Sequence, residues 1–156
     1  MKYRRLTKEQ LEEMHQEFIN FLATQSITAQ EWNDIKENNP AVAEEEIDIF
    51  SDLIWEGVLS KIAYLENIFD TGMHLFHLTE KEMKLIAVRV SQPGIDLRTK
   101  HGFGWFKQNF MGDNVEIMTA VKAYSDDKLK DRFELIEKGA IITKGELFRF
   151  FDDIIE

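Results

Sequence analysis

The sequence predicts an α+β protein in which a small antiparallel sheet of about three strands packs among about six helices, with residues 1–156 forming a single domain. Two observations support this prediction. A helix-start motif, Thr followed three residues later by Glu or Gln, occurs four times, with its Thr at positions 7, 28, 79 and 143. Over residues 73–90 the apolar pattern changes from helical spacing to short β-branched and aromatic runs. The chain has no Pro-rich, Gly-rich or low-complexity stretch that would indicate a linker.

Apolar residues at helical spacing predict three helices in the first part of the chain. The first runs from Lys8 to about Thr24, and the second begins at Thr28 and ends near Asn38. Pro40 suits the first turn of a third, longer helix, whose acidic start favours the positive end of the helix dipole. This helix is expected to be the central core helix, with the apolar positions Ile47, Phe50, Ile54, Val58 and Ile62.

The strands are predicted at 73–78, 83–90 and 115–124. The first two are joined by residues 79–82, which we interpret as a hairpin loop rather than a helix start. Both faces of these strands carry apolar side chains, so the sheet is expected to be covered on both sides.

Three further helices are predicted in the second part of the chain. The first begins at Asp96 and runs to about Phe110, although Gly102 and Gly104 each weaken it by roughly 1 kcal/mol relative to Ala. Ser125 is expected to cap the next helix, which closes at 138–139. The last begins at Thr143, with the expected buried residues Leu147, Phe148, Phe151, Ile154 and Ile155.

Composition and charge exclude several classes of protein. The chain has no cysteine, which excludes disulfides, thiolate zinc sites, iron–sulfur clusters and thiol catalysis. The longest apolar runs are only a few residues, whereas a membrane-spanning helix needs about 20, so no membrane association is expected. A cytoplasmic location is predicted, because no apolar stretch follows the basic residues 1–5 and cysteine is absent. A net charge of −10 argues against binding of nucleic acid.

Four segments of the chain resemble a family of short proteins from Bacteroidota, chiefly flavobacteria, that has no assigned function. They are residues 18–28, 50–59, 75–78 and 143–148. The resemblance extends from Tyr3 to Phe151 and implies a bacterial, cytoplasmic, single-domain protein. It supplies no catalytic residues.

The sequence offers only weak candidates for a catalytic or metal-binding site. Glu12 and His15 have the i, i+3 spacing of a di-iron ligand pair, but a second copy is missing and Glu12 falls on the polar side of its helix. His74 and His77 lie in a predicted strand and should point to opposite faces, with Glu82 or Lys84 as cross-strand neighbours. No nucleophile elbow, P-loop or dinucleotide fingerprint occurs. We therefore predict no cofactor and no metal, and we favour a protein without enzymatic activity.

One segment could bind a partner. No acidic residue occurs between Leu97 and Gly112, where cations are interleaved with aromatic residues. Such a segment can stack on rings or form a protein-binding hot spot, or it can be a core helix with its cations in solvent. The predicted binding residues are Arg98, Lys100, His101, Trp105, Lys107 and Phe110.

The favoured function is a protein-interaction or adaptor module that binds another bacterial protein. The alternatives are a small enzyme with an unrecognised Glu, Asp or His site, and a ribosome- or nucleic-acid-associated protein. The sequence leaves the oligomeric state open.

Overall fold

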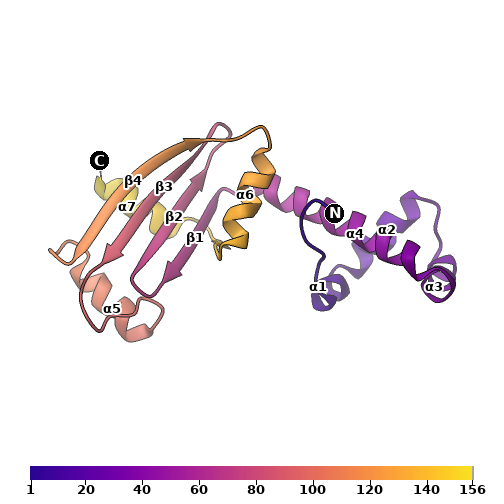
Figure 1. Cartoon of the computed structure of the whole chain (residues 1–156), viewed down its shortest axis with the longest axis horizontal. Coiled ribbons are helices and arrows are strands. Elements are labelled where there is room, and N and C mark those ends of the chain that lie inside the picture. Colours follow the sequence, from indigo (N-terminus) through magenta and orange to yellow (C-terminus); the bar gives the residue numbers. More distant parts are fainter. Residues whose placement is uncertain (156) are drawn as a thin grey trace. The chain divides into compact units, whose positions relative to one another are not determined.

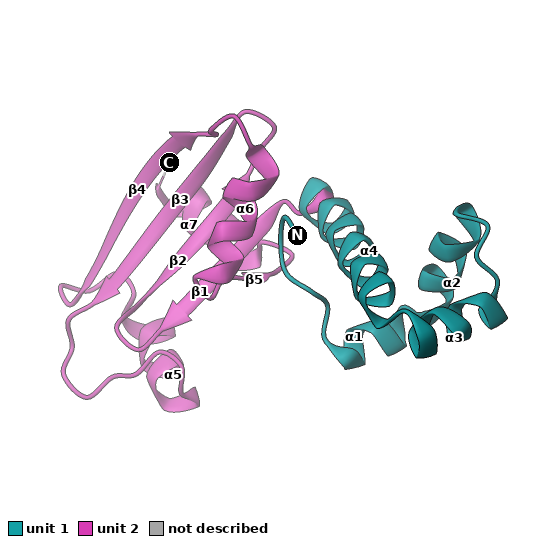
Figure 2. Ribbon diagram, turned by 45° about the vertical axis from the view of Figure 1, so that its right-hand side comes forward, with its two compact units in different colours: residues 1–60 teal, residues 61–156 magenta. Residues whose placement is uncertain are grey.

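The computed structural model describes residues 1–155, which form seven helices and one antiparallel sheet of five strands (Figure 1). The α+β prediction is confirmed, but the predicted number of about three strands is wrong. The backbone divides into two compact units, Met1–Ser60 and Lys61–Glu156 (Figure 2); the single domain stays a prediction. Within the described residues, no helix has both the length and the apolar character needed to cross a bilayer.

The first unit is built from four helices: α1 (Lys8–Glu13), α2 (His15–Thr24), α3 (Ala29–Asn38) and α4 (Pro40–Lys61). Thr7 and Thr28 form the predicted capping boxes, and each hydroxyl accepts from the backbone N–H three residues later at 3.1 Å. The predicted single helix over 8–24 is wrong, because the backbone departs from helical values at Met14. The N–H of Phe18 still donates to the Met14 carbonyl, so hydrogen bonding continues across the interruption.

Aromatic rings form the centre of this unit. The Phe18 ring lies 5.0 Å from that of Phe50 and 5.1 Å from that of Trp32. The residues before α1 are tied to α4: the Leu6 N–H donates to the buried hydroxyl of Ser51, and Arg5 pairs with Asp48 and Glu44. The basic residues at the start of the chain thus face carboxylates of α4.

The second unit contains the sheet, whose strands lie in the order β4-β3-β2-β1-β5 and are all antiparallel. The strands are β1 (Tyr64–Phe69), β2 (Gly72–Leu78), β3 (Glu82–Val90), β4 (Val115–Ala123) and β5 (Ile141–Ile142). The predicted hairpin is confirmed, and Thr79 closes it by accepting from the Glu82 N–H at 3.1 Å. The sequence did not reveal β1, because the strand follows directly on α4, or β5, because it has only two residues.

The three helices of the second unit are α5 (Lys100–Asn109), α6 (Lys128–Glu137) and α7 (Glu146–Ile155). Each begins later than predicted. Thr99 rather than Asp96 caps α5, and Asp127 rather than Ser125 caps α6. The Thr143 hydroxyl accepts from the Gly145 N–H in the turn before α7. Near the end of α7, Ile154 and Ile155 are exposed rather than buried, so the buried stripe stops at Phe151.

The sheet has two faces that differ in their cover. On the α7 face, side chains of β2 and β3 join residues of α5 and α7 in one core, which includes Met73, Leu75, Ile86, Phe106 and Phe151. Because side chains alternate along a strand, Leu65, Phe76, Leu85 and Ala120 lie on the opposite face, the α6 face. The prediction that both faces of the sheet are covered is wrong for β4, because seven of its nine residues are exposed.

Candidate functional site

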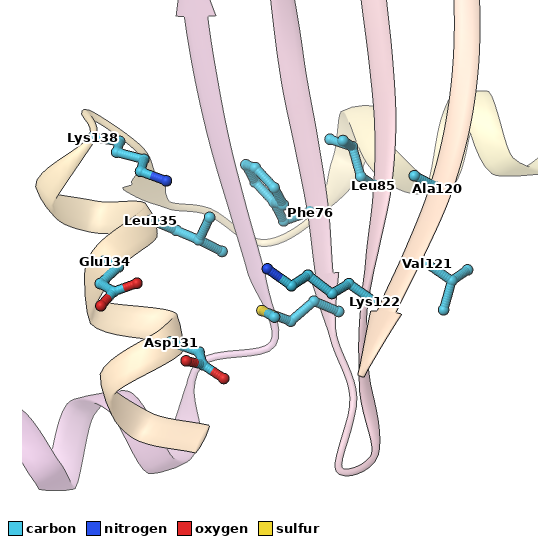
Figure 3. A pocket seen from close by; sticks show the side chains of 10 residues that line it. Phe76, Leu85, Ala120, Val121, Lys122, Asp131, Glu134, Leu135 and Lys138 are labelled. Carbon is cyan, nitrogen blue, oxygen red and sulfur yellow. The ribbon is translucent and has the colours of Figure 1, made fainter. Parts of the chain in front are cut away.

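A groove of about 240 Å³ lies between α6 and the α6 face of the sheet (Figure 3). Its floor is apolar and consists of Phe76, Met83, Leu85 and Ala120 from three neighbouring strands. Leu135 of α6 closes the other side. Figure 3 shows α6 on the β1 side of this groove, and on the β4 side Ala120 is exposed and Leu85 is half-buried. The groove can therefore receive apolar side chains.

Buried hydrogen bonds hold α6 in place. Arg132 is only 3% exposed, and its guanidinium donates to the Thr79 carbonyl and to the Tyr124 hydroxyl at 3.1–3.2 Å. The Tyr124 hydroxyl in turn donates to the Thr79 carbonyl at 2.7 Å. At the other end of α6, the Asn67 amide donates to the Lys138 carbonyl at 3.2 Å. The helix wall of the groove is thus fixed at both ends to the sheet.

Charged side chains surround the apolar floor. Asp131 has a structural role, because its carboxylate accepts from the backbone N–H and the hydroxyl of Ser125 at 2.7 and 2.8 Å. Glu134 of α6 and Lys138, the C-cap of that helix, are exposed. Lys122 extends from β4 across the groove towards α6 (Figure 3). This arrangement suits an apolar segment with charged flanks.

The residues that the sequence predicts as a binding site are only partly brought together. Phe106 of α5 is buried, and Trp105 and Phe110 are half-buried against the same core. Lys107 and Phe110 line a second, apolar pocket of about 280 Å³ between α5 and α7. Lys100 and His101 are exposed in the first turn of α5, outside that pocket.

Arg98 differs from the other predicted cations because it has a carboxylate partner. Its guanidinium donates to both oxygens of Asp96 at 2.9 and 3.0 Å. These hydrogen bonds lower the pKa of Asp96 and raise that of Arg98. Asp96 directly precedes the acid-free stretch, so the local excess of positive charge is smaller than the sequence suggests.

The histidines behave as the strand pattern predicts. His74 and His77 lie on opposite faces of β2, and His77 is opposite Lys84 in the register. The His77 ring stacks on Tyr64 with centroids 4.5 Å apart. Burial, and then the nearby Lys84, lowers the pKa of His77. Glu12 and His15 are exposed on separate helices, and among residues 1–155 no group of three His, Asp or Glu is placed to hold a metal.

A half-buried carboxylate, Glu66, lines a third pocket of about 410 Å³ together with Phe103, Lys144 and Glu146. Burial raises the pKa of Glu66 above its usual value, and the Glu146 carboxylate raises it further. A carboxyl group whose pKa is raised by folding stabilises the protein below its unfolded pKa and costs stability once it ionises.

We therefore expect Glu66→Gln to raise the free energy of unfolding at pH 7.5. This gain should disappear below about pH 4, where Glu66 is protonated in both states. Thermal unfolding of the variant and the wild type across this range measures the difference. Glu146→Gln, at an exposed position, is the matched control and should change stability less. A loss of stability in Glu66→Gln at pH 7.5 would show that the ionised carboxylate makes favourable contacts.

The groove residues were missed by sequence reasoning. The signal was present, since Phe76, Leu85 and Met83 are apolar residues on the second face of the strands. This pattern predicts a sheet that is covered on both sides. Only the position of α6 shows that part of that face is left open.

Comparison with known proteins identifies the chain at the level of a family. No curated protein and no solved structure matches it. The model of one protein family, described as a family of unknown function (DUF6495), matches residues 1–156. The match extends over the whole sequence and agrees with the predicted resemblance to a family without an assigned function. The chain therefore belongs to the DUF6495 family, whose function is unknown.

Proposed function

We propose that this protein is a non-enzymatic interaction module that binds an amphipathic helix of another protein in the groove beside α6. The observation that carries the proposal is the apolar floor formed by Phe76, Met83, Leu85 and Ala120, which α6 leaves open over β3 and β4. A helix with an apolar face docks into such a groove through residues at i, i+3, i+4 and i+7.

The geometry of α6 supports a helix as the ligand. Layers of secondary structure pack about 10 Å apart, and α6 already lies against one side of this face. A second helix beside α6 would complete the layer and cover the exposed Ala120 of β4. The hydrogen bonds of Arg132 and Asn67 hold the α6 wall in place, so little ordering is needed on binding.

The net charge favours a basic partner. At the rim of the groove Asp131 and Glu134 are balanced by Lys122 and Lys138, but the whole chain carries a net charge of −10. Such an excess of negative charge speeds the approach of basic partners and disfavours acidic ones. We expect the ligand to be a bacterial protein in the cytoplasm, as the resemblance to Bacteroidota proteins implies.

The groove is better supported as the binding site than the predicted residues 98–110. In that segment Phe106 is buried in the core and Arg98 is paired with Asp96. Lys107 and Phe110 contribute to a separate apolar pocket, whereas the groove combines an open apolar floor with charges at its rim.

The proposal predicts opposite results for two substitutions on the same face of β4. Ala120→Arg places a long charged side chain on the groove floor and should reduce partner recovery at least about tenfold. Met118→Arg lies on the same face, at a position that is 52% exposed and outside the groove lining, and should leave recovery unchanged. Tagged wild type and both variants are compared by quantitative mass spectrometry of proteins co-purified from the cells that express this chain.

Circular dichroism of both variants verifies that they fold, which is expected because both positions are exposed. Equal recovery with Ala120→Arg and with the wild type would contradict binding in the groove. Equal loss with both variants would place the contact on β4 itself rather than in the groove.

A further inference from the structure

We propose that β4 is a dimerisation edge, and that a second copy of this chain adds its own β4 in antiparallel fashion to form one continuous ten-stranded sheet. In the described part of the chain, β4 pairs with β3 on one side and borders no strand on the other. It is nine residues long, contains no proline and pairs with β3 without a bulge. The opposite edge, β5, has only two residues, and short edge strands resist pairing.

The hydrogen-bonding groups of β4 alternate between β3 and the free edge. The Ser91 N–H donates to the Asn114 carbonyl at 2.9 Å, which makes these two residues a hydrogen-bonded pair. In an antiparallel ladder every second residue repeats this arrangement. The even-numbered residues of β4 therefore bond to β3. The odd-numbered residues, with Thr119 at the centre, direct their N–H and C=O groups to the free edge.

One register makes β4 complementary to itself. If Thr119 of the two copies meet on a two-fold axis, all nine residues of β4 find a partner. Glu116 then lies opposite Lys122 of the second copy, twice in the dimer. Ile117 lies opposite Val121, and Met118 lies opposite Ala120. Shifting the strands by one step in either direction separates the opposite charges, so charge complementarity selects this register.

The exposed apolar side chains of β4 are consistent with a further strand pairing beside it. Met118 is 52% exposed and Val121 is 62% exposed, on opposite faces of the strand. An additional strand would place side chains beside both residues, one on each face of the sheet. Arg89 of β3 is opposite Glu116 in the register, so Glu116 would lie between two cations in the dimer. The Lys122 side chain crosses the groove in the single chain (Figure 3), and its flexible stem allows the ammonium group to turn to the edge.

Exchanging the charges of Glu116 and Lys122 tests this register. Sedimentation velocity of the full chain over a broad concentration range should show a monomer–dimer equilibrium. Lys122→Glu and Glu116→Lys should each weaken the dimer about tenfold or more, because two pairs of opposite charge become two pairs of like charge. The double variant E116K/K122E should regain wild-type affinity, as should an equimolar mixture of the two single variants. A wild-type monomer at all concentrations, or a double variant as weak as the single ones, would overturn the proposal.

A cysteine probe tests the two-fold axis directly, since the chain has no cysteine of its own. Opposed residues of a hydrogen-bonded pair have Cα atoms about 5.5 Å apart, within the range of a disulfide. Thr119→Cys should therefore form a cross-linked dimer under mild oxidation. Val121→Cys is the matched control on the same strand and face, and its copies would lie about 14 Å apart. Cross-linking that is absent from Thr119→Cys, or equal in both variants, contradicts the register.

The dimer does not depend on ligand binding in the groove. It would place two copies of the groove on the same face of one continuous sheet. Met118 and Ala120 are opposite each other across the proposed interface, so their arginine variants should affect the dimer alike and the groove differently.

Discussion

Replacement of Phe106 by alanine is expected to lower the free energy of unfolding of the 61–156 unit by about 3–5 kcal/mol. The side chain is 2% exposed, and its ring centroid lies 5.8 Å from that of Phe103 and 5.9 Å from that of Phe151. Removing this ring takes away buried apolar surface and leaves a cavity between α5 and α7. Urea denaturation measures the loss. Trp105 fluorescence reports on this unit in a background where Trp32 and Trp55, both in the first unit, are phenylalanine.

Phe150→Ala is the matched control, because this ring lies on α7 beside Phe110 but is 46% exposed. It should cost about 1 kcal/mol. The comparison also bears on the predicted binding segment. If Phe106→Ala lowers the free energy of unfolding no more than Phe150→Ala does, the rings of α5 do not form the core. Residues 98–110 would then be the preferred candidate for the binding site.

Elements with local signals were predictable from the sequence. The capping boxes at Thr7 and Thr28 locate the starts of α1 and α3, because both hydrogen-bond partners lie within one turn. The hairpin of β2 and β3 was recognised from two apolar runs joined by four residues. In contrast, Thr79 and Thr143 carry the same motif without starting a helix there. Tertiary pairing in the sheet outweighs the local signal at Thr79.

The candidate site was less predictable, because it depends on contacts between distant segments. The groove exists only because Arg132, Tyr124 and Thr79 fix α6 beside one part of the sheet. No local pattern encodes that position. The excess of positive charge in residues 98–110 is smaller than predicted for a related reason. Asp96 lies just outside the acid-free stretch, and its carboxylate accepts hydrogen bonds from the Arg98 guanidinium.

The two glycines of α5 illustrate what a sequence pattern cannot distinguish. Both lie inside the helix, and propensity alone predicts that each weakens it equally. The structure separates them. A Cβ on Gly102 would overlap the carbonyl group of Asp96, whereas a Cβ on Gly104 would meet no atom within 4 Å. Gly102 is thus a packing requirement, and Gly104 is a position where helix stability can be gained.

We therefore expect opposite effects from the same substitution two residues apart. Gly102→Ala should cost about 3 kcal/mol, because the Asp96 carbonyl is held by the N–H and the hydroxyl of Thr99 at 3.0 and 2.8 Å and cannot withdraw without breaking the cap of α5. Gly104→Ala should gain about 0.5–1 kcal/mol from helix propensity. The free energies of unfolding of the two variants, measured side by side, test this difference in sign. Two losses of similar size would show that α5 tolerates no added methyl group and that its fit to the Asp96 turn is not specific to Gly102.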